Sequence, residues 1–459
     1  MPDHPRFINH PSFAGLIGAG REDITPPVGI YARNWGAAKH DISEGIHRPL
    51  TVTVLALRSG PADPPLLLAG ADLGWWRTIE DEAFVRDGLL DAFSLEPARV
   101  MVNLAHTHAG PSICREDADK PGGRLIAPYL EKVRDALIRA ARAAVVSAAP
   151  ATLDWAYGRC ALARNRDLPD PDRDRFACGF NPDAPADDTL LVGRATADGG
   201  RPIATVVNYA CHPTSLAWDN RLISPDYVGA LRETVEARTA GAPCLFLLGC
   251  CGELGPREGY SGDPAVADRN GRELGYAALS TLEGMLPPRT RMEFAGIVES
   301  GAPLATWRHA AHEPSRRLEA ECLRVDLPLK PLDPLAKIEG ELKACADPVA
   351  AERLRRKLRV RRTVGEGTSA AVPVWVWRVG DAFIVGQPEE GYSRLQTDLR
   401  RSFPDHAVAA MNLVNGSCGY LPPRELYGRD LYQVWQTPFD GGSLERMIAA
   451  CQDQIRKMA

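Results

Sequence analysis

The sequence lacks an apolar run long enough to cross a membrane, since none approaches the roughly 20 residues that a spanning helix needs. Its N-terminal segment, MPDHPRFINHPSFAG, lacks the basic stretch and apolar core of a secretory signal. A basic face is missing too: the net charge is -5, with acids and bases spread along the chain. This balance argues against nucleic acid as a partner. We therefore expect a soluble, cytoplasmic protein with no integral membrane segment.

A disulfide-like spacing of cysteines is also absent. The 11 cysteines are odd in number and scattered, and the only close pair, Cys250 and Cys251, are chain neighbours. Free thiols in a reducing compartment are the expected state.

What the chain does have is the composition of a folded globular protein, with 45% hydrophobic and 25% charged residues. Its 459 residues allow one large α/β domain or a few small ones.

Short apolar runs alternate with helical patterns along the chain. The runs are apolar throughout, which predicts strands covered on both faces, over 50–57, 66–73, 100–106, 203–211 and 244–249. The 3.6-residue pattern predicts helices over 79–93, 127–146, 227–238 and 270–283. This alternation predicts an α/β fold of layered mixed β-sheets flanked by helices.

Three segments depart from this alternation. Residues 163–188 contain four prolines and many charges without either period, which predicts a long functional loop. The charged stretch near 331–366 predicts a solvated helical excursion, such as a helical hairpin. Residues 374–385 are interrupted by Gly380 and Asp381 and predict a β-hairpin that leads into Glu389 and Glu390. No repeat or linker divides the chain, so we expect a single domain over 1–459.

The clearest candidate for chemistry is the segment AHTHAGP at 105–111, where the strand that begins near Val100 ends. Residues two apart in a strand point to the same face, so His106 and His108 can address one site. Open α/β folds bind ligands at such strand ends. A lone histidine is more often structural, however, so this pair leaves metal binding and packing both open.

His212 is a second candidate, in the segment NYACHPTS at 208–215, where another apolar strand ends. It could cap that strand, but its position, equivalent to that of His106, favours a metal site. Zinc takes imidazole and carboxylate ligands, so we expect a carboxylate at a further strand end. Glu389 and Glu390 are both candidates, and the residues alone do not choose between them.

Six blocks resemble the neutral ceramidases and their shorter bacterial relatives, in family order and over nearly the whole chain. These blocks are IGAG with DITP at 17–26, GIH at 45–47, HTHAGP at 106–111, NYACHPTS at 208–215, the turn at 249–256 and PEE at 388–390. The resemblance implies that residues 1–459 form one ceramidase-like catalytic domain without a C-terminal immunoglobulin-like domain.

The resemblance also implies a catalytic Zn²⁺. Carried over position by position, the family's ligands fall on His106, His212, Glu390 and Tyr420. The match to a Pro-x-Glu turn is what selects Glu390 over Glu389.

Amide hydrolysis by metal-activated water is the activity that this resemblance implies. His108 is the expected acid and base, and Tyr432 the expected donor to the developing oxyanion. Arg164 and Arg166 resemble a family Asn-Arg element near the substrate, so we expect a substrate-binding role for Arg164 and a catalytic one for Arg166.

Two further features have alternative interpretations. Asp226 either orients His212 or caps the helix predicted from Tyr227. Tryptophans on predicted loops either line a pocket for an apolar or ring-shaped group or pack in the core or at a rim, and these are Trp35, Trp75, Trp76 and Trp218.

The resemblance fails at one turn. Ceramidases have Gly-Asp-Val-Ser-Pro there, with a serine implicated in catalysis or substrate binding, whereas this chain has GELGP at 252–256. Gly255 therefore offers no serine nucleophile, which favours direct attack by water, and we expect it to contact substrate. A cytoplasmic enzyme is poorly placed to extract ceramide from a bilayer, so a smaller amide or ester is the expected substrate.

We therefore predict a zinc-dependent amidohydrolase that cleaves a non-peptide C–N bond in an N-acyl or ceramide-like small molecule. Two alternatives remain: a zinc esterase or cyclic-amide hydrolase using the same site, and a metal-containing binding protein without turnover. Oligomeric state, including a homo-oligomer, is left open by the sequence.

Overall fold

The computed structural model describes residues 7–459, apart from the side chains at 348 and 349. The N-terminal segment interpreted above as lacking a secretory signal begins with residues 1–6, which lie outside the described residues. From residue 7 onward, no helix combines the length and apolar character needed to traverse a bilayer.

An eight-stranded mixed sheet forms the larger layer of the protein. Its order is β14-β12-β11-β7-β2-β4-β5-β6, and only the pairs β12–β14 and β5–β6 are parallel. The strands are β2 (Ser12–Asp23), β4 (Thr51–Arg58), β5 (Leu66–Ala71), β6 (Val100–Leu104), β7 (Ala149–Arg159), β11 (Thr189–Ala197), β12 (Pro202–Tyr209) and β14 (Cys244–Leu248).

A four-stranded sheet packs face to face on the first one. It has the order β18 (Leu318–Pro328), β19 (Ser369–Val379), β20 (Ala382–Gly386) and β22 (Ala407–Met411). Trp155 of the large sheet and Trp377 of the small one share a single buried cluster between them. Because both inner faces are apolar, the two sheets exclude water from each other.

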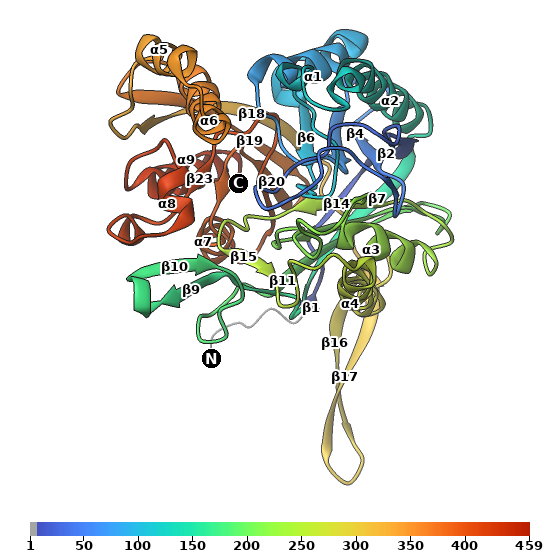
Figure 1. Ribbon diagram of the computed structural model, residues 1–459. Coiled ribbons are helices and arrows are strands. Elements are labelled where there is room, and N and C mark those ends of the chain that lie inside the picture. The colour runs from blue at the N-terminus through green and yellow to red at the C-terminus, as the bar shows by residue number, and fades with distance from the viewer. Residues whose placement is uncertain (1–6) are drawn as a thin grey trace.

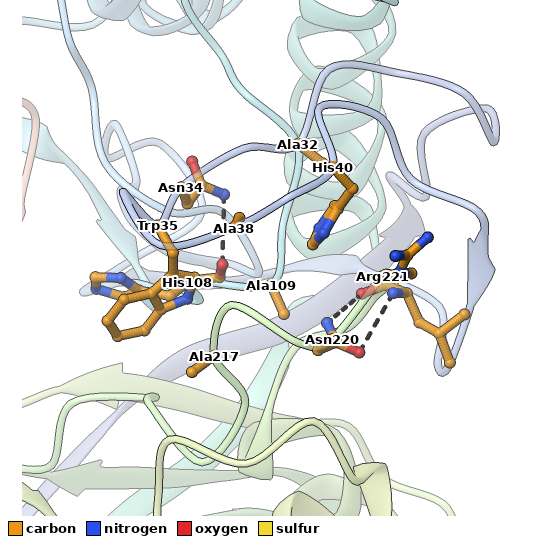
Figure 2. Close-up of a pocket in the computed structure, with 11 residues that line it drawn as sticks. Ala32, Asn34, Trp35, Ala38, His40, His108, Ala109, Ala217, Asn220 and Arg221 are labelled. Atoms are coloured by element: carbon orange, nitrogen blue, oxygen red, sulfur yellow. Dashed lines mark hydrogen bonds between the residues drawn. The ribbon is translucent and has the colours of Figure 1, made fainter. Parts of the chain in front are cut away.

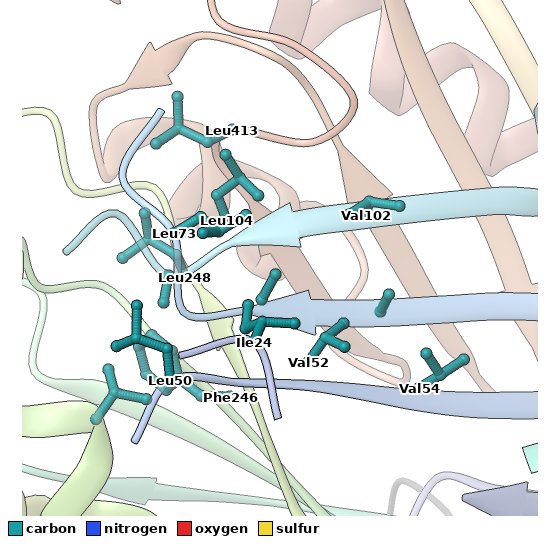
Figure 3. Packing of buried hydrophobic residues seen from close by; sticks show 14 of the residues in the cluster. Ile24, Leu50, Val52, Val54, Leu73, Val102, Leu104, Phe246, Leu248 and Leu413 are labelled. Atoms are coloured by element: carbon teal, nitrogen blue, oxygen red, sulfur yellow. The ribbon is translucent and has the colours of Figure 1, made fainter. Parts of the chain in front are cut away.

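Helices cover the outer face of each sheet, so the molecule has four layers, helix–sheet–sheet–helix (Figure 1). The large sheet carries α1 (Ile79–Phe93), α2 (Ile126–Val146), α3 (Tyr227–Glu236) and α4 (Pro264–Glu283), and the small sheet carries α7 (Arg394–Ser402) and α9 (Ser443–Met458). Apolar side chains from the strands and loops of the large sheet meet in the core beneath its helices (Figure 3).

The glycines of the IGAG block allow α2 to lie directly on β2. A Cβ atom added at Gly18 would come within 2.1 Å of the Ala144 carbonyl oxygen, and one at Gly20 within 2.1 Å of the Ala140 oxygen. No side chain fits in that space. This part of the family resemblance therefore reflects packing.

The large sheet curls so that its edge strand β14 approaches β5 and β6. The Leu248 amide donates to Oδ1 of Asn103 at 2.8 Å, and a Cβ atom at Gly70 would come within 2.6 Å of the Phe246 oxygen. The ends of β6 and β12, far apart in the strand order, are thereby brought together.

The predicted fold class is confirmed, and all five predicted strands and four predicted helices are present; the helix over 79–93 has the predicted ends and the others have shifted ends. The hairpin at 374–385 is confirmed as β19–β20, with Gly380 at φ 62° in the turn. The helical excursion expected near 331–366 falls on α5 (Leu335–Ala344) and α6 (Pro348–Val364). All 11 cysteines are free thiols.

The prediction of an irregular loop over 163–188 is wrong. This segment contains β8 (Ala163–Asn165), which pairs with β15 (Leu254–Pro256), and a hairpin of β9 (Asp167–Asp170) and β10 (Arg175–Cys178). Strands of three or four residues are too short to show a period. Their pairing depends on partners elsewhere in the chain.

The remaining strands are short or project from the body. A long hairpin of β16 (Thr290–Glu299) and β17 (Pro303–Ala311), joined by β1 (Phe7–Ile8), extends away from the layers (Figure 1). The other short elements are β3 (Gly45–Ile46), β13 (Leu222–Ile223), β21 (Glu390–Gly391), β23 (Tyr420–Leu421) and α8 (Tyr432–Gln436).

Candidate metal centre

Three side chains from distant parts of the chain converge in the interior. His106 follows β6, His212 follows β12, and Glu390 begins β21 after the β19–β20 hairpin. One donor atom from each lies within 4.8 Å of the others, and all three residues are buried. The group could hold a metal ion.

Glu390 is the centre of this group. Its Oε2 atom lies 2.9 Å from Nε2 of His212 and 3.3 Å from Nε2 of His106. Burial alone would raise the pKa of Glu390, but the two imidazoles hold it well below its usual range. The carboxylate is therefore ionised at neutral pH and available as a ligand.

Backbone carbonyls orient both imidazoles. Nδ1 of His212 lies 2.7 Å from the Cys251 oxygen, and Nδ1 of His106 lies 3.3 Å from the Gly74 oxygen. Carbonyls only accept hydrogen bonds, so each Nδ1 donates to its carbonyl and each Nε2 is directed at the centre, where a bound metal would take its lone pair. Burial and the Arg166 guanidinium lower the pKa of His212 to about 3, which keeps this imidazole neutral.

This donor set fits a divalent transition metal such as zinc. Two neutral imidazole nitrogens and one carboxylate oxygen are a common set for a catalytic zinc site with an open position. His106 also has φ 69°, a left-handed conformation that is rare outside glycine, and its buried Nε2 faces the Glu390 carboxylate. A costly backbone geometry that directs this nitrogen at the centre agrees with a ligand role.

Of the two glutamates that the sequence left open, only Glu390 joins the group. Both carboxylate oxygens of Glu389 are buried without a partner, and burial raises the pKa of this side chain to about 8. Glu389 is therefore protonated at neutral pH.

Tyr420 reaches the centre through strand pairing. β21 and β23 run parallel with Glu390 opposite Tyr420, and the Tyr420 ring stacks beside His212 at 6.4 Å between centroids. The tyrosine hydroxyl accepts a hydrogen bond from Nη2 of Arg166 at 3.2 Å. Burial, followed by the charge of Glu390, raises the pKa of Tyr420 well above its usual value.

Arg166 is a buried cation at the same place. Its Nη2 donates to the Gly252 oxygen at 2.8 Å and lies 3.1 Å from Nε2 of His212. With a metal ion on His212, this guanidinium keeps two other acceptors, the Gly252 carbonyl and the Tyr420 hydroxyl.

His108 lies beside the group rather than in it. Its ring is 4.8 Å from that of His106 and 6.3 Å from that of His212, and both of its nitrogens are buried without a partner. Burial, with smaller contributions from His106 and His212, lowers the pKa of His108 well below its usual value. The strand argument that paired His106 with His108 does not hold, because β6 ends at Leu104 and a turn brings the rings together.

The other predicted site residues lie around this centre. The Tyr432 ring, at the start of α8, meets the Tyr420 ring edge-on at 5.8 Å. Gly255 pairs with Arg164 across β15 and β8, and it lines a cavity of about 130 Å³ next to Arg166. Arg164 does not line that cavity, and its Nε is buried without a partner.

Asp226 caps α3, as one of its two interpretations predicted. Its carboxylate accepts from the amide of Tyr227 at 2.7 Å and from that of Leu216 at 2.9 Å. The alternative role of orienting His212 belongs to the carbonyls of Cys251 and Leu254.

Several groups at the site left no signal in the sequence. The carbonyls of Gly74, Cys251 and Gly252 are backbone atoms, which any residue supplies. Tyr260, whose ring contacts Trp35 at 5.7 Å, follows a loop with no period, and its role is visible only from its contacts.

Comparison with known proteins gives a match at the level of structure only. Searches with the sequence found no matching family model and no matching curated protein. The crystal structure of neutral ceramidase from Pseudomonas aeruginosa superposes with a TM-score of 0.68 at 17% identity, covering 98% of this chain and 75% of that one. A ceramidase complexed with C2 gives a TM-score of 0.65 at 17% identity, with 98% and 76% coverage.

The chain has the neutral ceramidase fold. The match spans nearly all of this chain, so the four layers and the strand ends that carry His106 and His212 belong to that fold. This agrees with the ceramidase-like architecture predicted from the six sequence blocks.

Proposed function

We propose that the protein is a metal-dependent hydrolase that cleaves an amide bond of a small molecule, with zinc as its metal. The observation that carries this proposal is the buried His106, His212 and Glu390 group, whose donor atoms lie within 4.8 Å of one another. The ceramidase fold supports an amide as the scissile bond, because the solved structures that share it are named ceramidases.

His106, His212 and Glu390 would hold the ion, with Tyr420 as the fourth candidate ligand. A zinc ion bound there would supply a Lewis acid for the substrate carbonyl and would acidify a water molecule. Burial of the group strengthens these electrostatic effects, since little water competes for the charges.

The surrounding side chains would carry the proton transfers. His108, with two unpartnered nitrogens, would take a proton from the attacking water and deliver it to the leaving nitrogen. Arg166 and Tyr432 would donate hydrogen bonds to the oxyanion that develops on the substrate carbonyl. Gly255 is the proposed substrate contact in the larger cavity, and Arg164, which pairs with it from β8 but does not line that cavity, is proposed as a contact only on the family element.

Metal analysis by mass spectrometry tests this proposal. Wild-type protein, purified without added metal, is expected to carry about one zinc ion per chain, and His106→Ala, His212→Ala and Glu390→Gln are expected to lose it. Glu389→Gln is the matched control, because it changes the neighbouring carboxylate that lies outside the group.

The loaded wild type should then hydrolyse members of a panel of N-acyl amides. An ester panel run in parallel separates an amidase from an esterase, and cyclic amides test the third alternative. A folded wild type without metal, or equal metal content in Glu389→Gln and Glu390→Gln, would contradict the assignment.

A further inference from the structure

Two separate cavities flank the candidate metal centre. One, of about 130 Å³, is lined by Arg166, Gly255 and Tyr260, and the other, of about 10 Å³, is lined by His108 and Trp35. No residue lines both. The edge-on contact of the Trp35 and Tyr260 rings, 5.7 Å between centroids, stands between them.

The proposed proton transfer assigns the two halves of an amide to these cavities. A general acid must lie within hydrogen-bond reach of the leaving nitrogen, which puts the amine on the side of His108. The acyl half then extends to the opposite side, where Arg166 and Gly255 line the larger cavity.

The size of the larger cavity limits the acyl group. An engineered protein cavity of about 150 Å³ binds benzene, so about 130 Å³ accommodates a group of roughly six heavy atoms. Phe180 and Tyr260 give the cavity aromatic walls, and the buried Arg166 also lines it. Such walls suit a short alkyl group or a planar ring.

Gly255 keeps this space open. A Cβ atom added there would meet Arg166 Cδ at 3.6 Å and Thr214 Oγ1 at 3.7 Å, which are ordinary contacts. A larger side chain is therefore sterically compatible with the protein at its first atom, and its further atoms would enter the cavity.

The cavity at His108 is much smaller. A volume of about 10 Å³ is close to that needed for a single water molecule. Asn34 fixes one wall, since its Nδ2 atom donates to the carbonyl of His108 at 3.4 Å (Figure 2) and to that of Gly110 at 2.8 Å. A leaving group the size of water, such as ammonia, fits there, whereas a larger amine does not fit without movement of the walls.

From these two volumes we infer that the substrate is a small carboxamide, with a short or ring-shaped acyl group of up to about six heavy atoms and a compact amine. Gly255 sets the acyl limit. This inference rests on the proposed function, since the assignment of the halves depends on the role of His108.

A substrate grid tests the inference on the zinc-loaded enzyme. Acyl groups from acetyl to hexadecanoyl, with benzoyl included, are combined with ammonia, methylamine and benzylamine as leaving groups. The highest kcat/KM is expected between acetyl and hexanoyl or at benzoyl, with at least a 10-fold fall at dodecanoyl and at benzylamine. One methylene in a pocket changes discrimination by about 10-fold or more, so the limit should be sharp.

Gly255→Val should lower kcat/KM for benzoyl and hexanoyl amides at least 10-fold while affecting acetyl amides least. Gly340→Val is the matched control, because Gly340 lies in α5 and a Cβ atom there meets no other atom within 4 Å. A wild type that prefers dodecanoyl or longer groups, or a Gly255→Val profile identical to that of wild type, overturns the inference and leaves the proposed hydrolase intact.

If no amide is hydrolysed, the proposed function is contradicted. The inference about the cavities can still be tested then, by measuring benzamide binding with calorimetry. Benzamide should bind the wild type and Gly340→Val, and bind Gly255→Val at least 10-fold more weakly, while dodecanamide should bind none of them detectably. Equal benzamide affinities for wild type and Gly255→Val would overturn the acyl cavity on its own.

Discussion

At the scale of single residues, hydrogen bonding separates the proposed metal ligands from the proposed acid–base residue. His106 and His212 have each Nδ1 facing a carbonyl, so their rings are fixed. His108 has no partner on either nitrogen. A buried imidazole without a hydrogen-bond partner lowers the stability of the folded state. Such a cost agrees with a role in a reaction, as we propose for His108.

His108→Asn should therefore lower kcat on the best amide by about 100-fold to 10,000-fold, the usual contribution of a general acid–base. Metal content should stay at the wild-type level, because His108 lies outside the ligand group. Parallel kinetics and metal analysis of His309→Asn, an exposed histidine on β17, control for the substitution itself. A variant with normal kcat would remove His108 from the mechanism.

The identity of each proposed ligand was only partly predictable from the sequence. His106 and His212 end apolar strands, which is a recognisable signal, and they join the group. The choice between Glu389 and Glu390 depended on family resemblance, because neighbouring carboxylates in one turn have the same local pattern. The structure distinguishes them, because Glu390 pairs with Tyr420 across β21 and β23 and joins the two histidines, whereas the Glu389 carboxylate has no partner.

At the scale of elements, the long strands and helices were predictable and the short ones were not. Extended apolar runs such as β4 and amphipathic stretches such as α2 have a hydrophobic pattern that identifies the element from its own residues. β8, β15, β21 and β23 have two or three residues each and form because the larger layers hold their partners nearby. These short strands are the ones that bring Arg166, Gly255 and Tyr420 to the centre.

A buried ion pair connects α3 to the loop beside His106. Arg232 makes two 2.6 Å hydrogen bonds to the carboxylate of Asp72, and the Leu73 oxygen accepts from the amide of His106 at 2.8 Å. Arg232→Ala should lower the free energy of unfolding by about 3–5 kcal/mol, because Asp72 is left buried and unpaired. Urea denaturation measures this loss.

The double variant Arg232→Met with Asp72→Asn removes both charges and should recover most of the loss. The asparagine oxygen can still accept from the Thr51 amide, as Asp72 does at 2.7 Å. If the double variant is no more stable than Arg232→Ala, the unpaired charge is not the cause.

Glu253 connects the turn before β15 to the start of α7, where its carboxylate accepts hydrogen bonds from the Ser393 amide and hydroxyl. Burial raises the pKa of Glu253 to about 7 in the folded protein, against about 4.3 in an unfolded chain. The folded state therefore binds more protons between these two values, so the free energy of unfolding should fall as pH rises from about 4.3 to about 7.

Glu253→Gln removes this titration. Its urea midpoint should exceed that of the wild type at pH 8, and the difference should shrink toward pH 5. Glu258→Gln changes an exposed glutamate nearby and should leave the pH dependence unchanged. Identical pH profiles for wild type and Glu253→Gln would contradict the prediction.

At the scale of the whole molecule, the site exists because a curled sheet and a second sheet meet. The sequence predicted the layers, but not the approach of β14 to β5 and β6 that joins the ends of β6 and β12. Curling depends on contacts between strands more than 100 residues apart, which local patterns do not encode. The long β16–β17 hairpin likewise projects away from the body, and nothing in its sequence indicated that position (Figure 1).

The metal should stabilise the whole molecule, because its proposed ligands come from both sheets. His106 and His212 follow strands of the large sheet, whereas Glu390 follows β20 of the small one. An ion that binds only the folded state at a free concentration 100 times its Kd adds about 2.7 kcal/mol to the free energy of unfolding. A chelator should therefore lower the Tm of the wild type, and added zinc should restore it.

Glu390→Gln should unfold at one temperature with or without chelator, and Glu389→Gln should respond as the wild type does. If neither chelator nor added zinc changes the Tm of the wild type, no ion connects the two sheets.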